Sequence, residues 1–166
     1  MTGCREEQTG SRLGQERSAT GPVACATLPS TFVHELRVRY GECDPQGIVF
    51  NANYLLYFDV AFTELWRAAV GPWQEMVGRG IDAVVAEANI SFRSPARFDD
   101  ELQLRARVTR LGSTAITTEI DVMRGDELLV AGRLRHVCVS TDTWTKTELP
   151  EWVRSGLEPF ASASAA

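Results

Sequence analysis

The feature that most constrains the fold is one long amphipathic stretch between residues 51 and 71. Asn51 or Asn53 can cap a helix at its start, and Gly71-Pro72 ends it. A helix of about 18 residues is about 27 Å long, so its apolar face needs a partner layer of similar size. The apolar residues at i, i+3, i+4 and i+7 spacing are Leu55, Phe58, Phe62, Leu65, Trp66 and Ala69.

Five further stretches of the chain read as β-strands. Four of them alternate apolar and polar side chains, and the last is an apolar run interrupted at 133–136, where we predict a bulge or register change. Glycine-containing links at 111–113 and 124–126 predict tight turns and hence an antiparallel meander. The stretches are residues 32–40, 84–92, 101–108, 116–122 and 128–139, and in the second of them Val84, Ala86, Ala88, Ile90 and Phe92 are predicted to share one face.

A sheet with one apolar face must cover that face, and a single long helix can do so. The chain therefore predicts an α+β fold in which a curved five-stranded antiparallel sheet wraps around one long central helix. The open edges of such a sheet are often protected by dimerisation. We expect a disordered leader over residues 1–30, the folded domain over 31–149, and a short C-terminal helix with a tail over 150–166.

Composition narrows the classes of function. The net charge of −5 argues against a duplex nucleic-acid binder, and no apolar run reaches the roughly 18 residues of a membrane helix, so neither nucleic acid nor membrane is an expected partner. The four cysteines include no C-x-x-C pair, which speaks against a zinc knuckle or a redox dithiol. Residues 1–30 hold no apolar core of signal-peptide length, so we expect a cytoplasmic protein with reduced thiols.

An acidic turn lies directly before the predicted helix. Asp44 sits in Cys43-Asp44-Pro45-Gln46-Gly47, and taken alone an aspartate before proline is more often a turn residue than a catalytic one. Its position beside a predicted helix start is nevertheless one where a carboxylate can take part in chemistry. A helix N-terminus offers unpaired N–H groups and the positive end of the macrodipole, and a carboxylate beside it can attack a carbonyl or activate water.

Two motifs carry a resemblance to a known family. The segment from Arg37 to Asp59 reads R-x-R-Y-G-E-C-D-P-Q-G-I-V-F-x-x-x-Y-L-x-Y-F-D, and the segment from Phe92 to Leu102 reads F-R-S-P-A-R-F-D-D-E-L. Together they resemble the hot-dog-fold acyl-CoA thioesterases of the 4-hydroxybenzoyl-CoA thioesterase family. The resemblance implies a hot-dog domain that pairs into homodimers, often dimers of dimers, with the active site at the dimer interface and no metal or organic cofactor.

The resemblance also assigns roles to residues. It implies that Asp44 is the catalytic acid and that backbone amides near Phe50 to Asn53 polarise the thioester carbonyl, which adds Asn51 to the catalytic set. Gly47 joins that set because a side chain there would block the backbone shape of the turn. The candidate substrate-binding residues are Val49, Phe50, Tyr54, Asp59, Arg93 and Arg97, the two arginines being candidates for the phosphates of coenzyme A.

Several of these residues have plainer interpretations. Tyr54 and Tyr57 are expected mainly to pack on the helix face, and Asp59 is expected to be a capped or paired polar residue. Glu64 lies three residues before Arg67, which predicts a surface ion pair, with a catalytic helix carboxylate as the reserve interpretation.

Three functions compete on this sequence. The favoured one is hydrolysis of acyl-CoA thioesters to free acid and CoA. The second is release of acyl chains from an acyl-carrier protein, whose reacting end is identical to that of CoA. The third is a hot-dog dehydratase or a non-catalytic acyl-CoA-binding protein. A dehydratase needs a histidine for proton removal, and the two histidines, His34 and His136, lie outside the motif.

Overall fold

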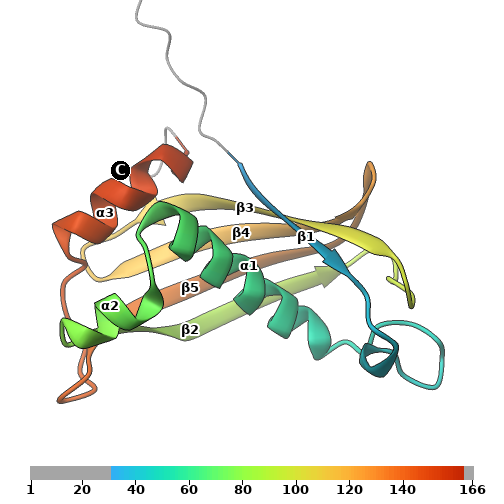
Figure 1. Ribbon diagram of the computed structural model, residues 1–166, viewed down its shortest axis with the longest axis horizontal. Helices are drawn as coiled ribbons and strands as arrows, with labels where there is room; N and C mark the ends of the chain where they lie inside the picture. Colours follow the sequence, from blue (N-terminus) through green and yellow to red (C-terminus); the bar gives the residue numbers. More distant parts are fainter. Residues whose placement is uncertain (1–30, 163–166) are drawn as a thin grey trace, which may run out of the picture.

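A computed structural model describes residues 31–162 (Figure 1). The leader predicted for residues 1–30 and the end of the predicted tail lie outside the described residues. None of the helices formed by the described part of the chain is long and apolar enough to cross a membrane. The elements are β1 Phe32–Arg37, η1 Tyr40–Glu42, α1 Asn53–Ala69, α2 Trp73–Gly78, β2 Ile81–Phe92, β3 Glu101–Leu111, β4 Ala115–Arg124, β5 Glu127–Ser140, α3 Glu151–Leu157 and η2 Glu158–Phe160.

The five strands form one antiparallel sheet in the order β1-β3-β4-β5-β2. The helix α1 crosses one face of this sheet, with α2 and α3 beside its far end (Figure 1). The predicted α+β architecture, a curved five-stranded sheet around one long helix, is confirmed. The edge strands are β1 and β2, and β2 is the longer of the two.

The buried face of α1 differs from the predicted one at its first turn. Leu55 is exposed, and Tyr54 and Tyr57 are buried in its place. Both tyrosines can lie in the core because their hydroxyl groups have partners there: Tyr54 accepts the amide N–H of Ala96, and Tyr57 donates to Glu42. The buried residues of α1 are Tyr54, Tyr57, Phe58, Ala61, Phe62, Leu65 and Trp66.

The predicted asparagine cap of α1 is wrong. Ala52 occupies the N-cap position and no side chain caps the helix. Asn53 is the first helical residue, and its side-chain amide donates to the backbone oxygen of Glu42 instead. The predicted end is confirmed, because α1 stops at Ala69 and Gly71 follows with a φ of 122°.

The irregularity predicted in β5 lies on the neighbouring strand. Val85 pairs with His136 and Glu87 pairs with Arg135, so Ala86 is an extra residue of β2 opposite two consecutive residues of β5. The extra residue also breaks the predicted face of β2. Ala83 and Val85 lie on the helix side before the bulge, whereas Ala88, Ile90 and Phe92 lie there after it, because cross-strand partners share a face. Val84 pairs with Val137 and lies on the opposite side, so the prediction that it shares a face with Ala88, Ile90 and Phe92 is wrong.

One glycine sets how closely α1 approaches the sheet. A Cβ atom added to Gly132 of β5 would lie 2.5 Å from ring atoms of Phe58, which is far inside van der Waals contact. Only a residue without a side chain lets this ring rest on the strand at that distance. The contact fixes the height of α1 above the middle of the sheet.

Candidate active site

The acidic turn is a tight hydrogen-bonded loop. The carboxylate of Asp44 accepts the amide N–H of Gln46 at 2.8 Å, and its backbone oxygen accepts the N–H of Gly47 at 2.9 Å. The amide N–H of Asp44 donates to the oxygen of Ile48 at 2.9 Å. Gly47 has a φ of 73°, a conformation that strongly favours glycine, which agrees with the backbone role expected for it.

This turn borders a cavity of about 580 Å³. The cavity lies at the end of the molecule where α1 begins and β2 finishes (Figure 1). Side chains from three separate segments meet there: the turn, the first residues of α1, and the segment after β2. Six of the candidate site residues line it, namely Asp44, Val49, Phe50, Asn51, Tyr54 and Arg93.

The start of α1 presents unpaired amide groups next to the acid. Within residues 31–162, no acceptor contacts the backbone N–H of Asn51 or Ala52, whereas Asn53 already donates to the oxygen of Phe50 at 2.9 Å. The first turn of α1 carries no acidic side chain that would offset its positive end. Asn51 and Asp44 both line the cavity, so a residue with an unpaired backbone N–H and the acid border the same space.

The F-R-S-P-A-R segment closes one side of the cavity through its backbone. The N–H of Val49 donates to the oxygen of Ala96 at 2.9 Å, and the hydroxyl of Tyr54 accepts the N–H of Ala96 at 3.0 Å. Arg97 pairs through its backbone with Ile48, but it does not line the cavity. In the described part of the chain, the guanidinium groups of Arg93 and Arg97 contact no carboxylate, so both are available to an anion.

Asp59 is separated from this cavity. It is exposed and borders a second cavity of about 440 Å³ between α1, the start of α2 and the first residues of β2. No hydrogen bond or ion pair holds its side chain within residues 31–162, so the expected polar pairing is absent there. Glu64, by contrast, forms the predicted ion pair with Arg67, and the hydrogen bond from Arg67 lowers the pKa of Glu64.

The second cavity contains a buried histidine. The ring of His136 stacks on Phe62 with centroids 3.6 Å apart and planes 5° apart. Its Nδ1 atom has no partner among the described residues. Burial lowers the pKa of His136 from 6.5 to about 4, so the ring is neutral at physiological pH.

Acid should therefore destabilise the fold through His136. In the unfolded chain this histidine binds a proton below pH 6.5, whereas the buried ring stays neutral to about pH 4. The free energy of unfolding should fall by about 3 kcal/mol over that interval. His136→Phe should remove this part of the slope in urea titrations at several pH values, whereas His34→Gln should keep it. If the free energy of unfolding of His136→Phe still fell by the same amount between pH 6.5 and pH 4, His136 would not be the cause of the acid destabilisation.

The sequence interpretation missed Glu42, the acid two residues before Asp44. The residue is only 9% exposed, and its side chain accepts hydrogen bonds from the Tyr57 hydroxyl and the Arg39 backbone. The missed signal was an acidic residue between the first strand and the acidic turn, with a tyrosine on the helix to pair with it.

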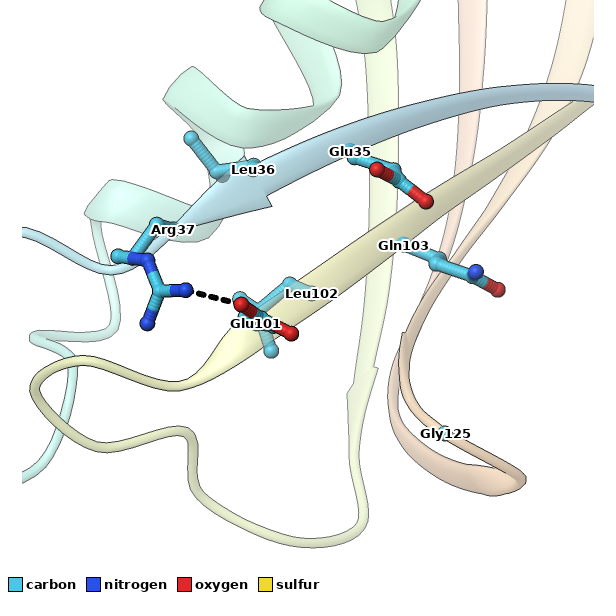
Figure 2. Close-up of a pocket in the computed structure, with 7 residues that line it drawn as sticks. All are labelled: Glu35, Leu36, Arg37, Glu101, Leu102, Gln103 and Gly125. Atoms are coloured by element: carbon cyan, nitrogen blue, oxygen red, sulfur yellow. Dashed lines mark hydrogen bonds and ion pairs between the residues drawn. The ribbon is translucent and has the colours of Figure 1, made fainter.

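A separate depression of about 410 Å³ lies at the β1 edge of the sheet and is shown in Figure 2. Glu35 and Gln103 lie side by side there on neighbouring strands, and Arg37 pairs with Glu101. Its only cation, Arg37, is already held by carboxylates, including Asp99 at 3.1 Å. This depression does not combine an acid with a helix start, so it lacks the parts of the Asp44 cavity.

Comparisons with known proteins agree with this geometry. The thioesterase superfamily profile matches residues 46–131, slightly more than half of the chain. The 4-hydroxybenzoyl-CoA thioesterase of Pseudomonas sp. strain CBS-3 is 32% identical over 126 residues, covering 64% of this chain and 89% of the relative. The acyl-CoA thioester hydrolase YbgC of Escherichia coli is 27% identical over 117 residues, covering 70% of this chain and 87% of the relative.

Structural similarity points the same way. A thioesterase superfamily protein from Jannaschia sp. CCS1 superposes with a TM-score of 0.76 at 26% identity, covering 81% of this chain and 95% of the other. The matched profile, the similar enzymes and the sheet wrapped around α1 lead to one conclusion. The chain belongs to the thioesterase superfamily.

Proposed function

We propose that this protein hydrolyses acyl-CoA thioesters to a free acid and CoA, with Asp44 as the catalytic acid. The observation that carries the proposal is that Asp44 and Asn51, whose backbone N–H is unpaired within residues 31–162, line the same cavity. The relatives named as acyl-CoA thioester hydrolases support the same reaction.

Each part has a task in the reaction. The N–H of Asn51, at the positive end of α1, stabilises the negative charge that forms on the carbonyl oxygen. Asp44 either attacks the carbonyl carbon or takes a proton from the attacking water. The C–S bond then breaks, the sulfur leaves as the thiol of CoA after protonation, and water supplies the new oxygen of the acid.

The free guanidinium groups of Arg93 and Arg97 are proposed to bind the phosphates of CoA. Arg93 borders the cavity and Arg97 lies on the same segment, so both can meet a phosphate outside it. An acyl-carrier protein presents the same thioester on one phosphopantetheine, and it is the competing substrate. The proposed location is the cytoplasm, because free Cys43 and Cys138 suit a reducing compartment.

A homodimer is proposed to complete the site through β2. In this strand Val85 and Phe92 are exposed, and its outer edge has no neighbouring strand within residues 31–162. Antiparallel pairing of two β2 edges needs a two-fold axis normal to the sheet, which keeps both α1 helices on one face. The Phe92 end of one strand then lies beside the Ile81 end of the other. This brings the Asp44 cavity next to the partner's Asp59 cavity, which would receive the acyl group.

The test is a thiol-release assay with a panel of aromatic, short branched and medium straight acyl-CoA esters, run beside the matching acyl-carrier proteins. We expect at least one acyl-CoA to be hydrolysed with a kcat/KM of about 10⁴ M⁻¹s⁻¹ or more, as is usual for an enzyme's own substrate. Turnover with carrier proteins alone would favour the second function. Binding of acyl-CoA with no turnover of either carrier would favour a non-catalytic protein and sink the proposal.

A further inference from the structure

Glu42 is the one acidic residue that is buried in the described part of the chain. Its Oε2 atom accepts the Tyr57 hydroxyl at 2.8 Å and the Arg39 amide N–H at 2.7 Å, and the Arg39 guanidinium lies 3.6 Å from Oε1. Burying a carboxylate is costly unless such donors surround it. The donors come from two places, the chain before the acidic turn and the second turn of α1, so the side chain joins these two segments.

The backbone oxygen of the same residue makes a second connection. It accepts the amide N–H of Phe50 at 2.9 Å and the side-chain amide of Asn53 at 2.7 Å. Phe50 directly precedes Asn51, and Asn53 is the first residue of α1. Glu42 is therefore hydrogen-bonded to a residue before Asn51 and to a residue after it. Asp44 lies two residues after Glu42 in the chain.

We propose that Glu42 is a positioning residue, which holds the loop carrying Asp44 against the start of α1 and so sets the separation between the acid and the Asn51 N–H. The inference rests on the proposed function, since it concerns the same site. Catalysis depends steeply on such a separation, and a misplacement of about 1 Å can cost about 100-fold in rate. Glu42 does not touch the substrate in this role, because it is buried and lies outside the lining of the cavity.

The link to Tyr57 persists across the usual assay range. Burial, together with the hydrogen bond to Glu42, raises the pKa of Tyr57. The phenol therefore stays protonated and goes on donating as pH rises through neutrality and above. Loss of the positioning effect should therefore lower kcat at every pH. It should not add a new ionisation to the dependence of kcat on pH in the alkaline range.

The experiment compares Glu42→Leu, which removes the side-chain acceptor, and Tyr57→Phe with the wild-type protein. We expect kcat to fall about 10- to 100-fold in each, with KM changed by less than about threefold, because the acid and the donor separate while the binding surface persists. The double variant should lose little more than the worse single variant, since both substitutions break the same hydrogen bond.

A matched control separates positioning from plain stability. Arg154 of α3 makes a comparable link far from the site, donating to the backbone oxygens of Leu111 and Gly112 at 3.1 and 2.9 Å. Arg154→Met should lower Tm to a similar extent and leave kcat within about twofold of wild type. If Glu42→Leu keeps a wild-type kcat while folded, or Arg154→Met loses as much kcat at the same Tm, the positioning role is refuted.

Hydrogen exchange provides a readout that needs no substrate. The hydrogen-bonded amides of Val49, Phe50 and Asn53 should exchange about tenfold faster in Glu42→Leu and Tyr57→Phe, but not in Arg154→Met. Unchanged exchange there would overturn the inference even if the enzyme is active. If wild type hydrolyses no thioester yet exchange rises as expected, the proposed function fails and the link between loop and helix stands.

Discussion

Replacing Asp44 by asparagine should reduce kcat with the best acyl-CoA substrate by about 100- to 10,000-fold, the usual contribution of a carboxylate that attacks or activates water. The fold should be unaffected, because the asparagine oxygen can still accept the N–H of Gln46 that closes the turn. KM should change little, since Asp44 contributes only part of the lining of the cavity. The measurement is steady-state thiol release by wild type and variant at matched oligomeric state.

The control for this substitution is Asp126→Asn. Asp126 is an exposed aspartate in the turn between β4 and β5, so its loss removes the same charge without touching the cavity. It should leave kcat and KM at wild-type values. A near-normal rate in Asp44→Asn would remove Asp44 from the mechanism, and an equal fall in Asp126→Asn would point to net charge instead of site chemistry.

Two inactive variants should restore each other's activity when they form mixed dimers. Asp44→Asn removes the acid of its own protomer, and Thr63→Trp fills the Asp59 cavity that is proposed to serve the partner. Thr63 lies half-buried on α1 at the border of that cavity. After equal amounts are unfolded and refolded together, half of the dimers carry one intact site, so activity should reach about one quarter of wild type.

The mixing experiment separates a shared site from a self-contained one. If each protomer works alone, the mixture should show only the sum of the two residual activities. Sedimentation of each variant must first show a folded oligomer of wild-type size. An active monomer, or full activity of Thr63→Trp by itself, would contradict the proposed participation of the partner.

Local patterns in the sequence predicted most of the fold. The 3.6-residue period identified α1, and the two-residue period identified the strands, because both patterns follow from one buried face. The errors occurred where the pattern is ambiguous. Leu55 is more apolar than Tyr54, yet the tyrosine is buried because its hydroxyl reaches the N–H of Ala96, 42 residues away in sequence. The pattern break near His136 was real, but the extra residue is Ala86 on the paired strand.

The candidate site was predictable where it is local in sequence. Asp44, Gly47 and Asn51 lie within eight residues of one another, so a turn and a helix start necessarily place them together. Arg93 joined them only through resemblance, since strand pairing brings its segment to the turn. Glu42 was missed because its role depends on Tyr57, 15 residues later, whose hydroxyl points back toward it.

The contact between Gly132 and Phe58 has a consequence for anyone reshaping this protein to accept other acyl groups. Phe58 lies five residues after Asn53, on the same helix as the proposed backbone donors. Its ring packs directly against the backbone of β5 because residue 132 has no side chain. Gly132→Ala would push Phe58 away from the sheet, and the N-terminus of α1 would move relative to the turn that carries Asp44. Substitutions that enlarge the proposed acyl cavity should therefore begin at lining side chains such as Thr63 and leave the contact between Gly132 and Phe58 unchanged.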